Sequence, residues 1–387
     1  MPLFLLLFAV ISILAFLAAA ASAQVIPAAQ MAALVGRAEE SGSVTSAEDV
    51  QTTAAMALEL NPYFVPQDSA AMQDVANVPV AVVVMHGHFV YTMAKMRPGG
   101  SPPEGDIMAY TVDSATGQAS VSYVGDRAPE IAGLGDIEHF TASPSGATIS
   151  RDVHRLPRPR HPRLVRAKIA TWGSGCKYAN SYHCYALADW QMGSSEQVEG
   201  TQTYQKTTTM DVPGSESGDF VDMEEWVIFG GGADYAEVGQ QGGSHKGCCT
   251  IWWFWALTYG KEYFPYEDPP EVWEIPYNVY AKYEWKSINP TEPIWCLVIG
   301  PNLETEYVCY RGFAIYNKWL EAGGEVATEQ KPSFAGSQEV NGQWLGSGEW
   351  KGWNFAHYST DGPEGSAPGL CYSYIGPTPG DMNYGTC

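Results

Sequence analysis

The sequence lacks the short motifs that mark the most widespread enzyme sites. It contains no GxSxG nucleophile elbow, no HExxH zinc motif, no phosphate-binding GxxxxGK loop and no GxGxxG dinucleotide fingerprint. These absences disfavour serine-hydrolase, zinc-hydrolase and nucleotide chemistry. A CxxC pair is also absent, which disfavours a cysteine-rich zinc site. We therefore expect a protein that works with no metal ion and no cofactor.

The chain is also short of basic residues. Its 387 residues include 21 Lys and Arg against 43 Asp and Glu, which gives a formal net charge of −22. A surface with this excess of negative charge repels phosphates, so we expect no nucleic-acid partner. The pI of about 4.6 suits an acidic, extracellular environment.

A long apolar run occurs only in the first 23 residues. This segment ends in the small-residue pattern Ala21-Ser22-Ala23, which predicts a secretory signal peptide that is cleaved before Gln24. The segment contains no Lys or Arg, so an uncleaved membrane anchor is the alternative. We expect a secreted, extracellular monomer that has no membrane contact once the signal peptide is removed.

Tryptophan and cysteine are missing from the first part of the chain. All 13 Trp and all eight Cys lie at or beyond Trp172, which predicts a domain boundary. Just before it, residues 151–168 hold seven of the 21 basic residues and three prolines, a composition that predicts an exposed, extended linker. This linker is either a processing site or a basic strap on an acidic domain. We predict an activation prosegment over residues 24–150 and a second domain over residues 169–387.

The predicted prosegment has the pattern of a small α+β unit. Residues 27–60 form an Ala-rich stretch that is compatible with helix. Residues 78–92 are β-branched and alternating, and residues 110–124 predict two strands joined around the Thr116-Gly117 turn.

Two histidines in this unit form a weak metal-site candidate. His86 and His88 would share one face of the predicted strand and could bind a metal ion together. The sequence offers no evident third ligand, so we predict no metal site there.

Residues 169–387 consist of short β-type runs separated by Gly, Pro and Asn. Strands at this spacing are typical of an antiparallel β-sandwich or jelly roll, so the predicted fold class is all-β. The even number of cysteines predicts disulfides. The local choices are Cys296 with Cys309, across two adjacent strands, and Cys371 with Cys387, across the C-terminal loop.

Two glutamates stand out from the many acidic residues of this domain by their context. Glu237 lies in an alternating stretch that ends at glycines, and Glu325 follows Gly323 and Gly324, which let another backbone or a ligand come close. Each alone is most simply a surface carboxylate. Two inward-facing glutamates on one β-face would instead form a coupled pair, in which one carboxyl stays protonated while the other ionises. Such a pair can activate a water molecule and protonate a departing amine.

The stretches MEEWVIFGGGADYAEVGQQGG and WLEAGGEVATEQKPSFAGSQEVNGQWLGSGEWKGWNF resemble the neprosin family of secreted glutamic peptidases. The resemblance covers roughly residues 220–355. It implies a signal peptide, an activation segment, a β-sandwich, a polypeptide substrate, and catalytic roles for Glu237 and Glu325. Glu321 is the reserve candidate for the second catalytic position.

The sequence departs from the family pattern at two tryptophans, which are Gln240 and Ala322 here. Substrate preference therefore cannot be transferred. The glutamine is similar to that of the related Gln/Glu fungal peptidases, where it polarises the scissile carbonyl, so we expect Gln240 to contact substrate.

The aromatic run from Trp252 to Trp255 allows two interpretations. It is either a core strand, or Trp252 or Trp253 faces a cleft and packs on substrate side chains or on a sugar ring. The second interpretation supports a rival function, a secreted β-sandwich that hydrolyses glycosides with two carboxylates. A non-catalytic wall-binding module is a third possibility.

Overall fold

The computed structural model describes the residue ranges 26–66, 77–95, 101–141, 183–191, 199–208, 210–212, 220–229, 234–243, 250–267, 273–274, 277–287, 294–300, 306–311, 317–327, 337–352, 357–360, 366–367, 370–374 and 382–386. The predicted signal peptide, the basic linker at residues 151–168, and Cys387 with its predicted disulfide lie outside these ranges. Among the described residues, no helix has the length and hydrophobicity needed to cross a membrane.

Residues 26–141, here called the N-terminal part, form two α-helices, one short 3₁₀ turn and six strands within the described ranges. These elements are α2 (Ala28–Ser41), β1 (Gly42–Thr53), α3 (Ala54–Glu59), β2 (Phe64–Val65), β3 (Pro79–Val90), β4 (Glu104–Asp113), β5 (Ala119–Gly125), η1 (Ile131–Gly133) and β6 (Ile137–Thr141).

The described residues from 183 onward form strands and no helix. These strands are β7 (His183–Gln191), β8 (Gly200–Thr207), β9 (Phe220–Phe229), β10 (Asp234–Gly243), β11 (Thr250–Tyr259), β12 (Glu262–Glu267), β13 (Trp273–Glu274), β14 (Tyr277–Ser287), β15 (Ile294–Gly300), β16 (Glu306–Arg311), β17 (Asn317–Ala327), β18 (Gln338–Gly346), β19 (Glu349–Gly352), β20 (His357–Thr360), β21 (Ser366–Ala367), β22 (Leu370–Tyr374) and β23 (Met382–Thr386).

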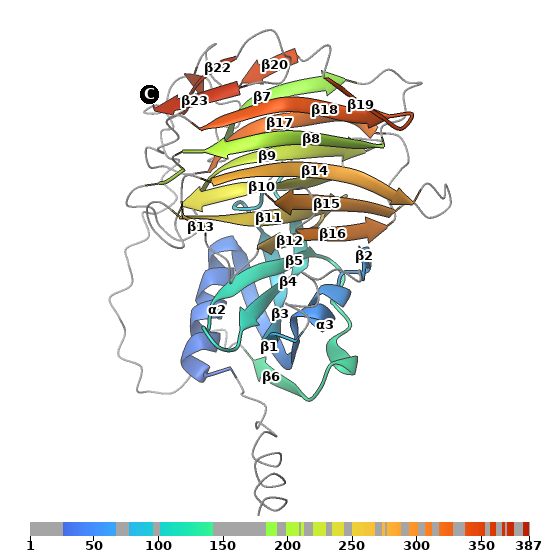
Figure 1. The fold of residues 1–387 in the computed structure, drawn as a ribbon. Helices are drawn as coiled ribbons and strands as arrows, with labels where there is room; N and C mark the ends of the chain where they lie inside the picture. Colours follow the sequence, from blue (N-terminus) through green and yellow to red (C-terminus); the bar gives the residue numbers. More distant parts are fainter. Residues whose placement is uncertain are drawn as a thin grey trace, which may run out of the picture.

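These strands form two antiparallel sheets that pack face to face (Figure 1). The larger sheet has the order β20-β7-β17-β9-β10-β11-β12-β5-β4-β3-β1-β6, and the smaller has the order β2-β16-β15-β14-β8-β18-β23-β22-β21. The predicted fold class, an all-β antiparallel sandwich, is confirmed.

Both sheets run without a break from the N-terminal part into the sandwich. In the larger sheet, Val124 of β5 pairs with Tyr263 of β12. In the smaller sheet, Phe64 and Val65 of β2 pair with Tyr310 and Cys309 of β16. The N-terminal part is therefore joined to the sandwich through two strand edges, which Figure 1 shows below the sandwich.

Within the N-terminal part, the sequence predicted the hairpins but not the first strand. β3 falls within the predicted strand at residues 78–92, and β4 and β5 join around Gly117, whose φ of 71° requires the left-handed region. The helical prediction for residues 27–60 is wrong at β1. This strand pairs with β3 on one side and β6 on the other, and these pairings override the helix propensity of its residues.

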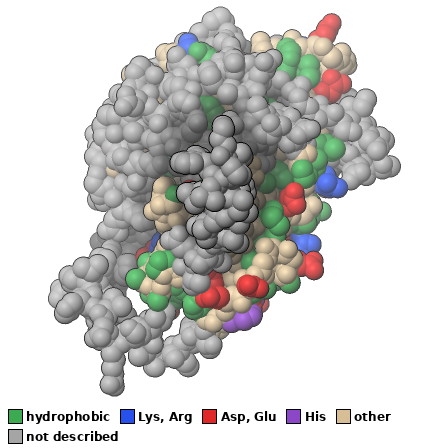
Figure 2. All heavy atoms as spheres, turned by 60° about the horizontal axis from the view of Figure 1, so that its bottom comes forward, with side chains coloured by type: hydrophobic (Ala, Val, Ile, Leu, Met, Phe, Trp, Pro, Cys, Tyr) green, Lys and Arg blue, Asp and Glu red, His purple; other side chains and the backbone are tan. Residues whose placement is uncertain are grey.

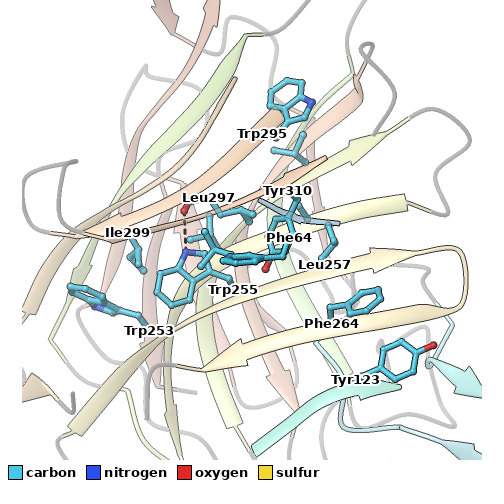
Figure 3. Packing of buried hydrophobic residues seen from close by; sticks show 14 of the residues in the cluster. Phe64, Tyr123, Trp253, Trp255, Leu257, Phe264, Trp295, Leu297, Ile299 and Tyr310 are labelled. Atoms are coloured by element: carbon cyan, nitrogen blue, oxygen red, sulfur yellow. Dashed lines mark hydrogen bonds between the residues drawn. The ribbon is translucent and has the colours of Figure 1, made fainter. Parts of the chain in front are cut away.

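The main hydrophobic core lies between the two sheets. Trp253, Trp255 and Leu257 of β11 pack there against Trp295 and Leu297 of β15 (Figure 3). The indole Nε1–H of Trp255 donates a 3.1 Å hydrogen bond to the backbone carbonyl of Leu297, which ties the sheets together.

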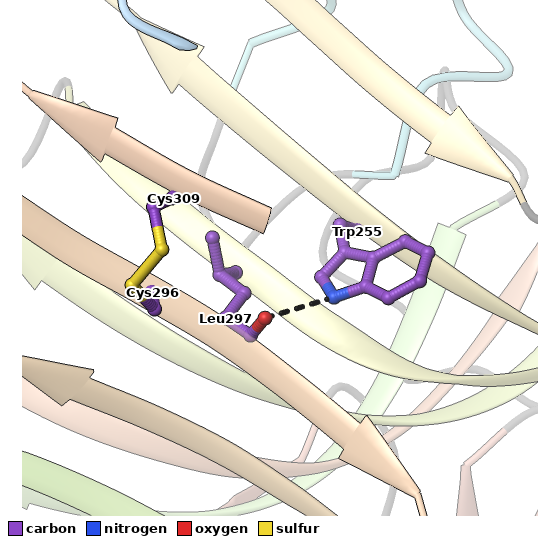
Figure 4. Close-up of a disulfide and its surroundings, with 4 residues drawn as sticks. All are labelled: Trp255, Cys296, Leu297 and Cys309. Atoms are coloured by element: carbon purple, nitrogen blue, oxygen red, sulfur yellow. Dashed lines mark hydrogen bonds between the residues drawn. A yellow bond between two sulfur atoms is a disulfide. The ribbon is translucent and has the colours of Figure 1, made fainter. Parts of the chain in front are cut away.

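The predicted disulfide between Cys296 and Cys309 is confirmed. These residues pair directly across β15 and β16, and both are buried. Figure 4 shows the bridge beside Leu297 and Trp255. It therefore joins two neighbouring strands of the smaller sheet next to the inter-sheet core.

Candidate active site

Three neighbouring strands of the larger sheet bring acidic side chains to one face. Glu237 of β10 pairs with Trp226 of β9, and Glu325 of β17 pairs with Asp222 of β9. Because side chains alternate along a strand, these residues and Glu224 point to the same side, away from the inter-sheet core. We call this side the acidic face and define it by Asp222, Glu224, Glu237 and Glu325.

All four carboxylates are fully buried, with 0% of their surface exposed. Carboxylate oxygens of Asp222, Glu224 and Glu325 lie within 4.8 Å of one another. On the molecular face drawn in Figure 2, by contrast, the acidic side chains lie at the surface and are scattered among other residue types. A buried group of this kind is costly unless protons or a cation neutralise it.

A glycine makes room for the centre of the acidic face. Gly239 of β10 pairs with Glu224, and a Cβ at this glycine would lie 2.1 Å from the carbonyl oxygen of Met223 and 2.8 Å from the Cα and Cβ of Glu224. Any other residue at position 239 would therefore collide with the backbone that carries Glu224.

The pKa values of the acidic face are raised by burial and by mutual repulsion. Burial raises the pKa of Glu237, and the charge of Glu325 raises it further. Burial also raises the pKa of Glu224 and of Asp222 well above the usual values, and neighbouring carboxylates add to both shifts. The group can therefore hold protons at a pH where exposed carboxyls are ionised.

Two hydrogen bonds orient carboxyl oxygens on this face. The indole Nε1–H of Trp226 donates to Oε1 of Glu237 at 3.2 Å. The backbone N–H of Glu325 donates to Oδ1 of Asp222 at 3.2 Å. Oε2 of Glu237 is buried and has no hydrogen-bond partner among the described residues, so this oxygen is the one that could carry a proton for a bound substrate.

The reserve candidate Glu321 lies on the same strand as Glu325. The register pairs Glu321 with Trp226, which in turn pairs with Glu237 on the other side. The described part of the chain does not include the side chain of Glu321.

The structure places the predicted substrate-contacting residues on opposite faces of the sheet. Alternation puts Trp252 on the acidic face, because it pairs with Gln241 next to Asp222. Trp253 points instead into the inter-sheet core. Gln240 also points toward the smaller sheet, where it accepts a 3.1 Å hydrogen bond from Thr207 Oγ1, so neither residue is brought to Glu237.

Sequence reasoning missed Asp222 and Glu224, although both belong to the MEEW stretch or directly precede it. The signal was available, since alternation places Asp222, Glu224 and Trp226 on one strand face. Alternation along β9 could not show that Glu237 and Glu325 lie on the same face of the sheet, because that depends on how β9 pairs with β10 and β17.

The spacing of the three clustered carboxylates is one that a hard cation can bridge. The cation that the structure places against the acidic face is the ammonium group of Lys95, which lies 4.3 Å from the ring centroid of Phe254.

The two predicted strand histidines have separate carboxylate neighbours. His86 lies 3.9 Å from Glu48, whereas His88 lies 3.1 Å from Asp106, measured from ring nitrogen to carboxylate oxygen. They do not converge on a common site.

A cavity of about 580 Å³ reaches Trp252, the predicted substrate-contacting residue on the acidic face. It is lined mainly by α3 and by β3, β4 and β5 of the N-terminal part, and none of the four carboxylates borders it.

No protein-family model matches the chain, and no curated protein matches its sequence. The resemblance to the neprosin family therefore stays a prediction. The solved structures that resemble part of this chain include a scytalido-glutamic peptidase bound to a transition-state analogue inhibitor, with a TM-score of 0.36 and 9% identity over 53% of this chain and 98% of that chain.

The same peptidase bound to a peptide-based transition-state analogue has a TM-score of 0.32 and 10% identity over 54% of this chain and 98% of that chain. A further structure, SCP-B of the eqolisin family of peptidases with the tripeptide Ala-Ile-His, has a TM-score of 0.30 and 11% identity over 54% of this chain and 98% of that chain. These structure neighbours are glutamic peptidases, but likeness at this level carries no argument about the activity of this chain.

Proposed function

We propose that the chain is a secreted glutamic endopeptidase that hydrolyses polypeptides at acid pH. The observation that carries the proposal is the buried acidic face, on which Glu237 has a raised pKa and the charge of Glu325 contributes to that shift. Coupled carboxyls that share protons are suited to acid–base catalysis, because one can donate a proton while the other accepts one. The sequence resemblance assigns the same two glutamates.

The proposed mechanism gives each of the two carboxyls one role. Glu325 takes a proton from a water molecule as its oxygen attacks the carbonyl carbon of the scissile peptide bond. Glu237 holds a proton on Oε2, hydrogen-bonds the carbonyl oxygen, and then transfers this proton to the leaving nitrogen as the C–N bond breaks. Trp226 orients Glu237 by its hydrogen bond to Oε1. Transfer of a proton from Glu325 to Glu237 restores the starting state.

The proposal includes synthesis as a zymogen. Residues 1–23 would be removed as a signal peptide, residues 24–150 would act as an activation prosegment, and cleavage within the basic linker would release residues 169–387 as a monomeric peptidase. The strand edges β5 and β2, which join the N-terminal part to the sandwich, supply the contacts that such a prosegment needs.

A sugar-binding function has less support. Among tryptophans whose burial is described, Trp350 is the exposed one, at 37% exposure, whereas Trp226, Trp253, Trp255 and Trp295 are fully buried. Sugar-binding platforms need aromatic rings that face solvent.

The test is an assay of the secreted protein on denatured protein and on polysaccharides at about pH 3 to 5. Mass spectrometry should detect new peptide termini from the protein substrate and no release of sugar. Cleavage of a polysaccharide with the protein substrate intact would favour the glycosidase, and binding without cleavage would favour the wall-binding module.

A further inference from the structure

Lys95 is a buried lysine from the N-terminal part that lies against the acidic face. Its side chain is 3% exposed, and its Nζ lies 4.3 Å from the ring centroid of Phe254 and 5.2 Å from that of Phe220. These rings belong to β11 and β9, which flank β10, and alternation places both on the acidic face. Lysine is almost never fully buried unless its charge is paired, so the surroundings of Lys95 must stabilise its positive charge.

Backbone contacts fix Lys95 at this position. Its N–H donates a 3.0 Å hydrogen bond to the phenolic oxygen of Tyr263, and the N–H of Ala94 donates to the carbonyl of Tyr91 at 3.3 Å. The rings of Tyr91 and Tyr263 also pack together, with centroids 6.2 Å apart. Residues 91–95 are therefore part of the contact between the N-terminal part and β12.

The positive charge of Lys95 acts on the carboxyls of the acidic face. Burial and then the charge of Glu325 raise the pKa of Asp222 and of Glu237, whereas Lys95 lowers both. The further titratable groups around this site are Glu224 on β9, Tyr235 on β10, Tyr263 on β12 and Tyr91 in the N-terminal part. Lys95 thus favours the ionised forms of Asp222 and Glu237.

We infer that Lys95 is an internal inhibitory cation, which keeps the N-terminal part closed over the acidic face until acid protonates the carboxyls around it. The inhibitory consequence rests on the proposed peptidase function, since it supposes that substrate must reach Glu237 and Glu325. The position of Lys95 against the rings of Phe254 and Phe220 on the acidic face does not depend on that function.

Protonation and release reinforce each other in this scheme. A protonated carboxyl no longer offsets the cost of burying an ammonium group, so acid removes the interaction that holds Lys95 in place. Once Lys95 leaves, its lowering effect on the pKa of Glu237 ends, and Glu237 binds its proton more firmly. Release therefore creates the protonated carboxyl that the proposed mechanism uses.

The experiment compares three variants of the full chain with the wild type. Lys95→Met keeps most of the side-chain volume and removes the charge, whereas Lys95→Arg keeps the charge. Lys261→Met is the matched control, because Lys261 is 70% exposed and lies 3.7 Å from Glu104 on the surface. Thermal unfolding at about pH 7 and about pH 4 is measured first, followed by cleavage of a denatured protein without acid pretreatment.

We expect Lys95→Met to lower the melting temperature at about pH 7, and this loss to vanish or reverse at about pH 4, where the carboxyls are protonated. Full-length Lys95→Met should cut its substrate with no lag and at least about tenfold faster at first than the wild type. Lys95→Arg and Lys261→Met should keep the lag. An equal melting-temperature loss at both pH values, or an unchanged lag in Lys95→Met, would overturn the inference.

If Lys95→Met fails to fold, acetylation of the wild type tests whether Lys95 is held in its buried position against the acidic face. At about pH 7 the reagent should modify Lys95 at least about tenfold more slowly than Lys261, and equal rates would overturn the inference. If the melting temperatures and labelling agree with the inference but no preparation cuts protein at any pH, the proposed peptidase function fails, and the role of Lys95 in holding the N-terminal part against the acidic face stands.

Discussion

The indole Nε1–H of Trp226 donates a 3.2 Å hydrogen bond to Oε1 of Glu237, and neither side chain has exposed surface. This bond lowers the pKa of a carboxyl that burial and the charge of Glu325 hold above its usual value. The indole therefore limits how firmly Glu237 holds the proton that the proposed mechanism requires.

Replacing Trp226 with Phe removes the donor and keeps an aromatic ring. Hydrogen bonds to charged groups contribute about 1.5 to 3 kcal/mol, so the alkaline limb of the kcat/KM profile should move upward by roughly one to two pH units. Trp344→Phe, on the other sheet, is the control. A pH profile that stays in place, or that moves equally in the control, would contradict the assigned role of Trp226.

The stability of the fold should fall as pH rises. The folded-state pKa values of Asp222, Glu224 and Glu237 are raised, so the folded state binds more protons than the unfolded chain above about pH 4. The stability that these three carboxyls contribute is fully present below their unfolded-state pKa values, and it is lost as pH rises through their raised folded-state pKa values. Calorimetry at constant ionic strength should give a lower melting temperature at about pH 7 than at about pH 4.

Glu224→Gln isolates this effect, because glutamine keeps the shape of the side chain and does not titrate. The difference between the two melting temperatures should shrink in this variant and stay unchanged in Glu349→Gln, which alters an exposed residue. A higher melting temperature at neutral pH in the wild type would contradict the proposed state of the acidic face.

The disulfide between Cys296 and Cys309 should stabilise the sandwich without taking part in catalysis. It closes a loop of 13 residues in sequence separation, so replacing both cysteines with alanine should lower the unfolding free energy by roughly 2 to 4 kcal/mol. Denaturant titration measures this loss. Peptidase activity of the folded variant at room temperature should match that of the wild type, and a selective loss of activity would show a role beyond stability.

Acidification should release a product whose first residue lies between about Arg151 and Trp172. At neutral pH, residues 169–387 carry 28 acidic and 10 basic residues and attract the basic linker, and this attraction fades as the carboxylates protonate. N-terminal sequencing identifies the product. A fully active sample that contains only intact chain starting at Gln24 would exclude processing.

Local patterns predicted much of the fold. The alternation at residues 78–92, the turn at Gly117 and the pairing of Cys296 with Cys309 each depend on neighbouring residues, and the structure contains all three. The strand at residues 42–53 was missed because its stability comes from pairing with β3 and β6, which lie far along the chain.

The candidate site was less accessible to sequence reasoning. The positions of Glu237 and Glu325 followed from glycine context and family resemblance, whereas Asp222 and Glu224 join them only through the register of β9 with β10 and β17. Lys95 lies more than a hundred residues from these strands in the sequence, so no local pattern could associate it with them. Gln240 was predicted to contact substrate, but strand alternation turns its side chain toward the inter-sheet core.

Turnover by Glu237→Gln and Glu325→Gln tests the central claim most directly. Each variant should fold like the wild type, as judged by circular dichroism, and lose roughly 10² to 10⁴-fold in kcat on a denatured protein at acid pH, because glutamine cannot transfer a proton. Glu349→Gln should retain full activity. Normal turnover by either variant would contradict the proposed dyad, and Glu321→Gln would then be the variant to measure.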